Sequence, residues 1–482
     1  MLELLRGEPG APALIVPDGP SLSYAALRER VEQAAGELAA AGVGRGDRVA
    51  LVLPNGADAV VAFLAAALAG TAAPLNPNYK REEFRFYLED TGVRLLVVPP
   101  GGAPEARAAA PPGASVVEVG RASARGGTLV PPSPDDVALV LHTSGTTSRP
   151  KRVPLTHANL AVSAKNIADT YQLTPDDVSL CAMPLFHVHG LIGSMLATFY
   201  SGGAVVVPPA FNALSFWSVA EKYRVTWYSA VPSIHLLLLA RARGEGRPPG
   251  AGRLRFIRSC SSALAPATMQ DLESRFGAPA LEAYGMTEAS HQMASNPLPP
   301  AARVPGSVGR GTGVDIAILD ERGTRLEAER QGEVSIRGPN VTRGYEDNPE
   351  ANAAAFTNGW FRTGDEGVLD AAGYLRLIGR IKELIVRGGE KISPREIDEV
   401  LALHPAVGEA VSFGLPHRVW GEEVAAAVVL KTPASEADLA AHCRSRLADY
   451  KCPKTIHIVD KIPRTATGKI QRRTVAAQFA GS

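Results

Sequence analysis

Cysteine is scarce in this chain: only four of its 482 residues are cysteines. They stand at Cys181, Cys260, Cys443 and Cys452, with no Cys-x-x-Cys pair and no histidines at metal-ligand spacing beside them. The sequence therefore predicts neither structural disulfides nor a zinc site. A reduced, cytoplasmic setting is the expected compartment.

An excess of charge of one sign is also missing. The chain has 50 Lys and Arg against 49 Asp and Glu, a net charge of +1. This balance argues against nucleic acid or an acidic membrane surface as the main partner.

Long apolar segments and targeting signals are absent as well. The longest apolar stretch, residues 59–75, is rich in alanine and is interrupted by Gly70, Thr71 and Pro74. A membrane span is therefore not expected. Residues 1–10 lack the apolar core of a signal peptide, and residues 480–482 do not form a peroxisomal address.

Short apolar strands alternating with helices fill most of the chain. Ser23 is a plausible N-cap for a helix that ends at Gly42, and further helices are expected to end near Gly70 and to start at Glu82. Buried strands are expected at 48–53, 95–98, 137–141, 204–207, 225–229, 254–259 and 279–283. This alternation predicts an α/β fold with parallel sheets covered on both faces.

The pattern of predicted secondary structure changes twice toward the C-terminus. From Val314 it predicts strands joined by tight turns (314–319, 332–337 and 374–377), which would form a small β-rich unit. Beyond Arg380 it predicts a compact α+β unit, with strands at 384–387, 410–413, 424–430 and 455–459 and helices at 394–403 and 436–447. A chain of this length exceeds one core, so we expect two domains, 1–381 and 382–482, with the boundary at Lys382.

The stretch Leu141–Lys151 has the residue pattern that most clearly indicates a ligand-binding loop. An apolar strand runs into a loop of small hydroxyl residues, one glycine and a terminal lysine. Backbone N–H groups, hydroxyls and an ammonium group suit an anion such as phosphate. The spacing is not that of a Walker loop, and the alternative interpretation is a flexible Ser/Thr surface turn.

Four further motifs follow in order. Tyr284–Glu288 places a hydroxyl and a carboxylate after a strand, which suits phosphate and Mg²⁺. Trp360–Gly367 holds Asp365 after a glycine, where it could accept both hydroxyls of a ribose. Charged residues follow at the domain boundary, from Gly379 to Lys391, and the stretch Pro463–Ile470 places Lys469 after a glycine turn. In isolation Lys469 would be read as a solvated surface lysine.

Together these five motifs resemble the adenylate-forming superfamily, which includes acyl-CoA synthetases, adenylation domains and firefly luciferase. The resemblance covers nearly the whole chain. It implies a large N-terminal domain of two αβ sheets plus a small β-barrel, followed by a smaller mobile α+β C-terminal domain. It also implies an ATP-dependent acid–CoA ligase that works through an acyl-adenylate and uses ATP, Mg²⁺ and coenzyme A.

The resemblance assigns roles to individual residues. The implied catalytic residues are Lys469, Thr287, Glu288 and His187, and the implied metal ligands are Glu288 and Thr146. The implied contacts to the ATP phosphates are Thr143, Ser144, Gly145, Thr146, Thr147 and Lys151. The other implied nucleotide contacts are Ser261, Ser262, Glu282, Ala283, Tyr284, Gly285, Asp365 and Arg380. Lys382 matches the hinge position, and Gly388 and Gly389 match the segment that faces the thiol of CoA.

Substrate choice is expected to depend on His187, Ser261 and His291. Buried polar groups would be left unpaired by a fatty tail, whereas they suit a second carboxylate on a very small acid. The alternative is that these histidines pack against the nucleotide or the protein. The runs PLFHVHG, FIRSCS and RGGEKISP resemble the oxalate–CoA ligase branch of the family, which implies oxalate as the acid.

Other functions remain open from the sequence. The acid could be malonate, another short acid or a medium-chain fatty acid, and the acyl group could pass to a carrier protein. From a different class, the chain could be a catalytically silent nucleotide-binding protein on the same fold. One departure from the family pattern is Arg152, which stands where glycine follows Pro-Lys in most members. The sequence does not predict its effect.

Overall fold

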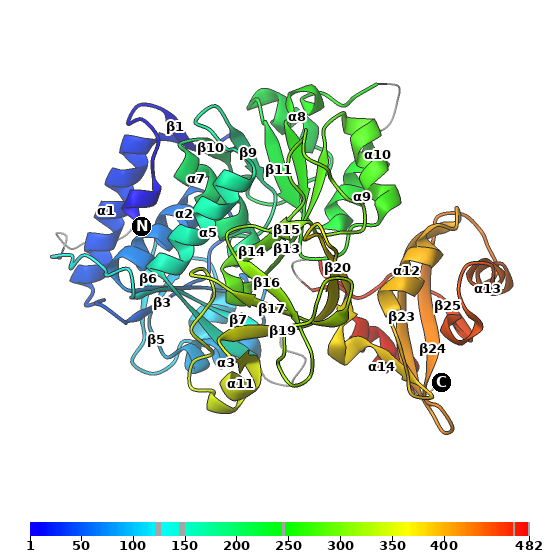
Figure 1. The fold of residues 1–482 in the computed structure, drawn as a ribbon. Helices are drawn as coiled ribbons and strands as arrows, with labels where there is room; N and C mark the ends of the chain where they lie inside the picture. The colour runs from blue at the N-terminus through cyan, green and yellow to red at the C-terminus, as the bar shows by residue number, and fades with distance from the viewer. Residues whose placement is uncertain (121–126, 144–149, 243–245, 466–467, 481–482) are drawn as a thin grey trace.

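The structure is a computed structural model that describes residues 1–120, 127–143, 150–242, 246–465 and 468–480. These described residues form four sheets, three in the N-terminal part and one in the C-terminal part. In Figure 1 the C-terminal unit lies to one side of the larger N-terminal body.

The first sheet carries the strand that leads into the predicted phosphate loop. It has six strands in the order β6-β5-β3-β4-β7-β8, all parallel except the last pair, β7 and β8. The crossovers include α2 (Ala57–Ala69) and α3 (Arg81–Thr91), as the sequence predicts. The strands are β3 (Arg48–Leu51), β4 (Thr71–Pro74), β5 (Val93–Val98), β6 (Ser115–Glu118), β7 (Val137–Thr143) and β8 (Lys151–Thr156).

The second sheet has nine strands, in the order β15-β14-β13-β12-β11-β9-β10-β1-β2. Its six central strands are parallel, and antiparallel strands close both edges. The strands are β1 (Pro12–Ile15), β2 (Ser21–Ser23), β9 (Val178–Cys181), β10 (Ala204–Val206), β11 (Trp227–Ala230), β12 (Phe256–Ser259), β13 (Ala280–Met286), β14 (His291–Ser295) and β15 (Arg310–Gly311).

Helices cover these two sheets. The predicted first helix is confirmed as α1 (Tyr24–Ala40), where the Ser23 side chain accepts the N–H of Ala26 at 3.2 Å as an N-cap. Residues 191–196 form a π-helical turn, a geometry that is frequent at functional sites. The other helices are α4 (Pro104–Ala108), α5 (His157–Thr170), α6 (Val188–Gly190), α7 (Ala197–Ser201), α8 (Phe216–Lys222), α9 (Pro232–Arg241), α10 (Pro266–Phe276) and α11 (Pro349–Ala355).

The β-rich unit expected from Val314 onward is a five-stranded antiparallel sheet. Its strands are β16 (Asp315–Leu319), β17 (Gln331–Arg337), β18 (Phe356–Thr357), β19 (Trp360–Leu369) and β20 (Leu375–Arg380). In Figure 1 this sheet lies between the two large sheets and the C-terminal unit. It therefore carries Asp365, on β19, toward the boundary between the two parts of the chain.

The C-terminal unit has a core of its own. Two clusters of buried residues, reaching from Ile385 to Val475, contain no residue of the preceding part. This separate core supports the proposed boundary at Lys382. The elements are β21 (Ile385–Arg387), β22 (Glu390–Ile392), α12 (Pro394–Ala402), β23 (Val407–His417), β24 (Gly421–Leu430), α13 (Glu436–Arg444), β25 (Thr455–Ile458) and α14 (Arg472–Phe479).

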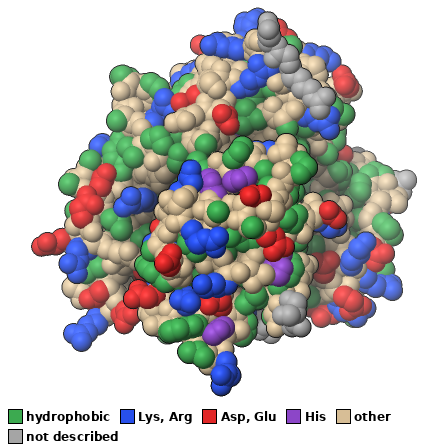
Figure 2. All heavy atoms as spheres, turned by 90° about the vertical axis from the view of Figure 1, so that its right-hand side faces the viewer, with side chains coloured by type: hydrophobic (Ala, Val, Ile, Leu, Met, Phe, Trp, Pro, Cys, Tyr) green, Lys and Arg blue, Asp and Glu red, His purple; other side chains and the backbone are tan. Residues whose placement is uncertain are grey.

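The described helices include none that is both long and apolar enough to cross a membrane. Figure 2 looks onto the side of the molecule that carries the C-terminal unit. Basic and acidic side chains are interspersed over this face, as the balanced composition leads us to expect.

Candidate active site

The predicted phosphate loop connects two paired antiparallel strands, β7 and β8. Thr143 ends β7 and Lys151 begins β8, and the two residues are direct cross-strand partners. The Lys151 ammonium group lies 4.4 Å from the centroid of the Tyr345 ring, a cation–π contact. The predicted ligands Ser144, Gly145, Thr146 and Thr147 lie outside the described residues.

Arg152, the departure from the family pattern, ties this hairpin to its surroundings. Its guanidinium donates to the main-chain oxygen of Asp90 in α3 and forms an ion pair with Asp347. It also lies 3.3 Å from Glu346, which pairs with Arg48 at 2.7 Å. Arg152 therefore anchors β8, through ion pairs that a glycine cannot make.

The other side of the hairpin has a matching anchor. His142 faces Arg152 across the two strands, and its Nε2 lies 2.9 Å from an Oδ of Asp90. Because Asp90 contacts both residues, the two strands are held at the base of the loop by one residue of α3. Burial lowers the pKa of His142, although Asp90 opposes this shift.

Glu288 follows β13 in a single 3-10 turn, Thr287–Ala289, and is 6% exposed. Its Oε1 accepts a hydrogen bond of 2.8 Å from the hydroxyl of Tyr345, the residue whose ring receives Lys151. Among the described residues no group of three or more potential ligands converges on one point. A lone carboxylate fits Mg²⁺, which is commonly held by one or two carboxylates together with phosphates and waters.

Asp365 and Arg380 form the charged pair expected for the ribose. They are register partners on β19 and β20, and Arg380 Nε lies 2.8 Å from Asp365 Oδ1. The hydroxyl of Tyr284 donates to the other oxygen of Asp365. Burial raises the pKa of the Asp365 carboxyl while Arg380 opposes the shift. The structure thus brings three predicted nucleotide residues into contact.

Lys469 lies at the same place although it is almost ninety residues farther along the chain. Its neighbour Gly468 packs against α9, where a Cβ would lie 2.9 Å from Ser233 Oγ. Lys469 is an exposed residue, but its ammonium group lies within electrostatic reach of Arg380, Asp365 and Glu288 and is partly desolvated there. Desolvation and Arg380 therefore lower its pKa, while Asp365 and nearby glutamates oppose the shift.

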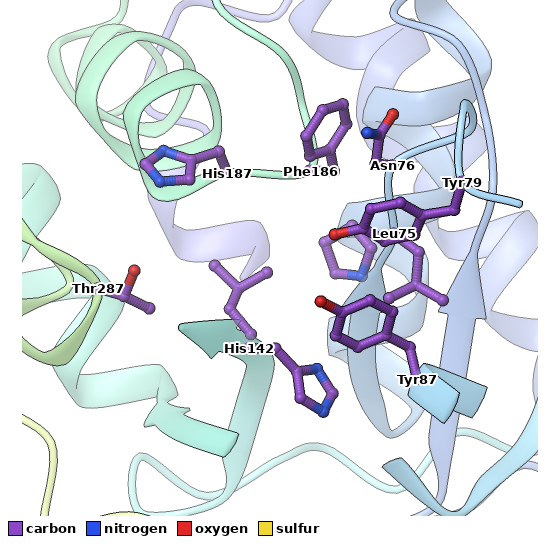
Figure 3. Close-up of a pocket in the computed structure, with 10 residues that line it drawn as sticks. Leu75, Asn76, Tyr79, Tyr87, His142, Phe186, His187 and Thr287 are labelled. Atoms are coloured by element: carbon purple, nitrogen blue, oxygen red, sulfur yellow. The ribbon is translucent and has the colours of Figure 1, made fainter. Parts of the chain in front are cut away.

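A pocket of about 340 Å³, its open mouth included, borders this site. Figure 3 shows His187 and Thr287 on one side of it and Tyr79 and Tyr87 on the other. The two tyrosine rings stack, with centroids 4.9 Å apart. The full lining is Pro74, Leu75, Asn76, Tyr79, Tyr87, Leu141, His142, Phe186, His187 and Thr287.

The three residues predicted to choose the acid come together beside this pocket. Ser261 Oγ lies 3.0 Å from Nδ1 of His189. The ring of His189 in turn lies 5.0 Å from the ring of His291, centroid to centroid. His187 caps the short helix α6, and its Nδ1 accepts the N–H of His189 at 3.2 Å.

The protonation of His187 follows from its surroundings. Burial and the nearby Lys469 lower its pKa to about 4, so the ring is neutral near pH 7. Since Nδ1 is the acceptor in the helix cap, we assign the proton to Nε2. His187 can therefore donate a hydrogen bond to an anion in the site.

Backbone strain concentrates around the residues that are predicted to select the acid. Ser261, Ser290 and His291 all have positive φ, at 72°, 51° and 104°. Such conformations are uncommon for residues with a side chain and cluster at ligand sites. Gly285 is required beside them, because a Cβ there would come within 2.1 Å of the His291 carbonyl oxygen.

Other predicted nucleotide residues make protein contacts. Glu282 is 2% exposed and its Oε1 accepts the N–H of Leu264 at 3.0 Å. The same oxygen lies 3.9 Å from Arg395 of α12, a contact between the two parts of the chain. Burial raises the pKa of Glu282 to about 7. Ala283 is buried in β13, and Ser262 is partly exposed.

The residues predicted for the hinge and the thiol lie away from the nucleotide contacts. Lys382 is exposed in a 3-10 turn between β20 and β21. Gly388 and Gly389 form the two-residue turn of the hairpin β21–β22, both with positive φ, as a type I′ turn requires. Gly388 donates to the carbonyl of Trp420 at 2.8 Å. The hinge and thiol roles stay predictions.

Several residues of the site were missed from the sequence. His189, Ser229 and Arg258 interact beneath the acid-selecting residues, and Tyr345 connects Glu288 with Lys151. The signal for His189 was available, since it lies two positions after His187 in PLFHVHG. Arg258 stands inside an apolar strand pattern, and nothing in its spacing indicates where its side chain points.

Comparison with known proteins places this geometry in context. The AMP-binding enzyme family matches residues 3–346, and its C-terminal domain matches residues 396–469. An oxalate–CoA ligase of Arabidopsis thaliana is 48% identical, covering 98% of this chain and 96% of that protein. One of Saccharomyces cerevisiae is 47% identical, covering 91% and 88%.

A solved structure of the same kind is ATP-bound MatB from Rhodopseudomonas palustris. It is 32% identical with a TM-score of 0.90, and the alignment covers 98% of this chain and 96% of MatB. The apo form of MatB has a TM-score of 0.79. The structure of this chain is therefore more similar overall to the ATP-bound form of MatB than to its apo form.

Proposed function

The chain belongs to the AMP-binding enzyme family, and on that premise we propose that it is an AMP-forming acid–CoA ligase whose preferred acid is oxalate. It joins the acid to AMP with release of pyrophosphate, and then transfers the acyl group to the thiol of coenzyme A. The substrates are oxalate, ATP and CoA, with Mg²⁺ as the metal.

One observation carries the first half of this proposal. Lys469 is brought from the C-terminal unit to the pair formed by Asp365 and Arg380, and its charge also reaches His187. Attack of a carboxylate on the α-phosphate brings two anions together. A cation placed between them stabilises the charge that develops in the transition state.

The remaining residues position the nucleotide. Tyr284 lies against the adenine and donates to Asp365, which accepts the ribose hydroxyls. Thr287 contacts the α-phosphate from the turn after β13, while Thr143 and Lys151 hold the two ends of the phosphate loop. Ser144, Gly145, Thr146 and Thr147 complete the phosphate contacts by family resemblance.

Glu288 is the residue that would hold the metal. Its hydrogen bond from Tyr345 fixes one carboxylate oxygen, which orients the other for coordination. When bound, Mg²⁺ neutralises phosphate charge and supports the departure of pyrophosphate. Tyr345 thereby links the metal ligand to Lys151.

The second half-reaction requires Lys469 to leave. We place the hinge at Lys382, between domains 1–381 and 382–482, and assign the Gly388–Gly389 turn to the thiol side after the rotation. Among the described residues, the contacts that must break include Ser393 Oγ to the Ile378 carbonyl at 2.6 Å, Arg395 to the Leu377 carbonyl at 3.2 Å, and Arg395 to Glu282. The pocket beside His187 and Thr287 is the space through which the thiol approaches the acyl group.

Oxalate as the acid rests on two supports. His187, Ser261 and His291 supply polar groups around a small site, and two relatives at 47–48% identity carry the name oxalate–CoA ligase. We place the reaction in the cytoplasm, in keeping with the four buried free cysteines.

The test is the substrate panel. The purified protein is incubated with ATP, Mg²⁺ and CoA and with acids from oxalate and malonate to octanoate, and pyrophosphate release and thioester formation are measured. We expect CoA-dependent turnover to be highest with oxalate. A preference for octanoate would overturn the choice of a small dicarboxylate, and absence of pyrophosphate release with every acid would indicate a silent nucleotide-binding protein.

A further inference from the structure

Arg258 is a buried charge without a countercharge. It lies on β12 in the centre of the nine-stranded sheet, and its exposed fraction is 0%. Its guanidinium donates to neutral partners only: Ser229 Oγ at 2.8 Å, the Tyr171 hydroxyl at 2.9 Å and Gln292 Oε1 at 2.9 Å. Within the described part of the chain, no carboxylate comes within ion-pair distance of it.

A charge in this position is costly unless something compensates it. Removing an ion from water without a partner of opposite sign is strongly unfavourable, and buried charges in proteins are therefore paired as a rule. Burial raises the pKa of the adjacent Cys260 thiol, which keeps this thiol neutral. The described residues thus supply no anion that would compensate the charge of Arg258.

A chain of hydrogen bonds connects Arg258 to the acid site. Ser229, its register partner on β11, accepts from Arg258 and lies 2.6 Å from Nε2 of His189. The opposite ring nitrogen of His189 lies 3.0 Å from Ser261 Oγ. Three side chains thus separate the buried charge from the acid.

The donor and acceptor in each of these hydrogen bonds follow from Arg258, which can only donate. Because Arg258 donates to Ser229, the Ser229 hydroxyl proton is directed to Nε2 of His189, so His189 carries its own proton on Nδ1 and donates to Ser261. Ser261 then has its hydroxyl proton available for a ligand. The reverse order would leave the Ser229 hydroxyl proton without an acceptor among the described residues.

The charge of Arg258 also affects the protonation of a second histidine, His291. Burial and Arg258 lower the pKa of both His189 and His291 well below the usual value, so both rings are neutral. Nε2 of His291 is buried and has no hydrogen-bond partner among the described residues. His291, which has a positive φ, thus holds an unpaired ring nitrogen beside the series of hydrogen bonds that leads from Arg258 to Ser261.

We propose that Arg258 is a specificity-determining residue that makes the acid site select a second carboxylate. This inference rests on the proposed function and deepens it. The positive charge, uncompensated in the protein, stabilises an anionic group bound at Ser261 and His291, beyond the carboxylate that reacts. Arg258 does not touch the acid and acts as a positioning residue, through Ser229 and His189.

The experiment compares acids in matched pairs, with and without the second carboxylate: oxalate with glycolate, malonate with propionate, and succinate with butyrate. Pyrophosphate release gives kcat and KM for the wild type, R258M and R258K. Met keeps much of the side-chain volume without the charge, and Lys keeps the charge without the planar fork. The matched control is R255M, because Arg255 lies three positions earlier and is paired with Asp177 at 2.5 Å.

For R258M we expect kcat/KM for the preferred dicarboxylate to fall by about 10- to 100-fold, mainly through KM, because the uncompensated charge that stabilises the second carboxylate is lost. The kcat/KM for the matched monocarboxylate should change by less than about threefold. The selectivity ratio, which is kcat/KM for the dicarboxylate divided by kcat/KM for the monocarboxylate, should therefore decrease strongly. R258K should recover part of the ratio, and R255M should leave the ratio unchanged even if it lowers Tm.

Equal losses for both members of each pair would show that Arg258 is only structural and overturn the inference. If the wild type prefers malonate or succinate, oxalate as the substrate is wrong, and the ratio within that pair still tests Arg258. If no acid is turned over, the increase in Tm on adding oxalate or glycolate replaces kcat/KM. Protection by oxalate that is the same in the wild type and R258M would then overturn the inference.

Discussion

The nucleotide half and the acid half of the site treat charge differently. In the nucleotide half, the buried Asp365 pairs with Arg380 and the half-buried Glu346 pairs with Arg48, while Glu288 accepts a hydrogen bond from the neutral hydroxyl of Tyr345. In the acid half, Arg258 has only neutral partners, and the histidines around it are neutral.

The difference shows which ligand each half can recognise. Paired charges hold side chains in place for ribose and phosphate, which are then bound by preformed hydrogen bonds. An unpaired charge is completed by its ligand, and it disfavours a ligand that brings no opposite charge. The two halves therefore separate the general chemistry of the family from the choice of acid.

The largest effect is expected where a mobile cation joins the two halves. Lys469→Ala should lower adenylate formation from acid and ATP by about 100- to 1,000-fold, because the charge between the carboxylate and the α-phosphate is lost. Thioester formation from supplied acyl-adenylate and CoA should continue. The two half-reactions are measured separately, with Lys461→Ala as the control lysine in the same domain.

An equal loss in both half-reactions would contradict this role of Lys469. It would indicate that the lysine stabilises the fold or a single closed arrangement, and not the first step alone.

Acidification should act on the acid half through its buried histidines. His235 lies on α9, with its ring 5.6 Å from the ring of Tyr228, the residue before Ser229 on β11. His235 is 0% exposed, and burial lowers its pKa to about 4. The unfolded histidine titrates near pH 6.5, so below that pH the unfolded chain takes up a proton that the folded chain does not. Stability should fall between pH 6.5 and about 4, by about 2 kcal/mol at pH 5 from this residue alone.

The measurement is urea unfolding of the wild type and His235→Gln between pH 7.5 and pH 5. The variant should lose less stability over this range than the wild type, whatever its stability at pH 7.5. Parallel pH profiles for the two proteins would show that His235 does not contribute.

Tyr345→Phe tests the neutral partner of the metal ligand in the nucleotide half. Loss of the hydrogen bond to Glu288 should raise the Mg²⁺ concentration needed for half-maximal pyrophosphate release by about tenfold, the value of one hydrogen bond to a charged group. The ring that receives Lys151 is kept. Tyr374→Phe is the control, since its hydroxyl donates to the Ala302 carbonyl at 2.6 Å, outside the site. An unchanged Mg²⁺ requirement would argue against the coupling.

The smallest effect on activity is expected for Arg152→Gly, which restores the family residue. The ion pairs at the base of the loop would be lost, but Glu346 keeps Arg48, so stability should fall by only about 1–3 kcal/mol. Because Thr143 and Lys151 remain strand partners, kcat should stay within about threefold. Denaturation and ATP kinetics measure the two effects, with Arg343→Ala as an exposed ion-pair control. A loss of kcat above about tenfold would show that Arg152 shapes the loop itself.

Most parallel strands of the two large sheets could be predicted because they are short apolar runs between helices, but β1, β4 and β9 of the same sheets were not predicted. Elements that do not follow this pattern were missed. β14 (His291–Ser295) is fully buried although three of its five residues are polar, and β19 contains two glycines of the ribose motif. In both strands the contacts are made with groups distant in the chain, so local periodicity does not indicate them.

The sequence by itself determined the family and the order of its motifs, because a phosphate loop, a metal carboxylate and a late lysine are recognisable from local spacing. Only the tertiary structure decided how charge is distributed around the acid. Arg258, Ser229, His189 and Ser261 come from three separate segments, and whether a buried arginine has a countercharge depends on all its neighbours in space. That property cannot be read from the neighbours of Arg258 along the chain.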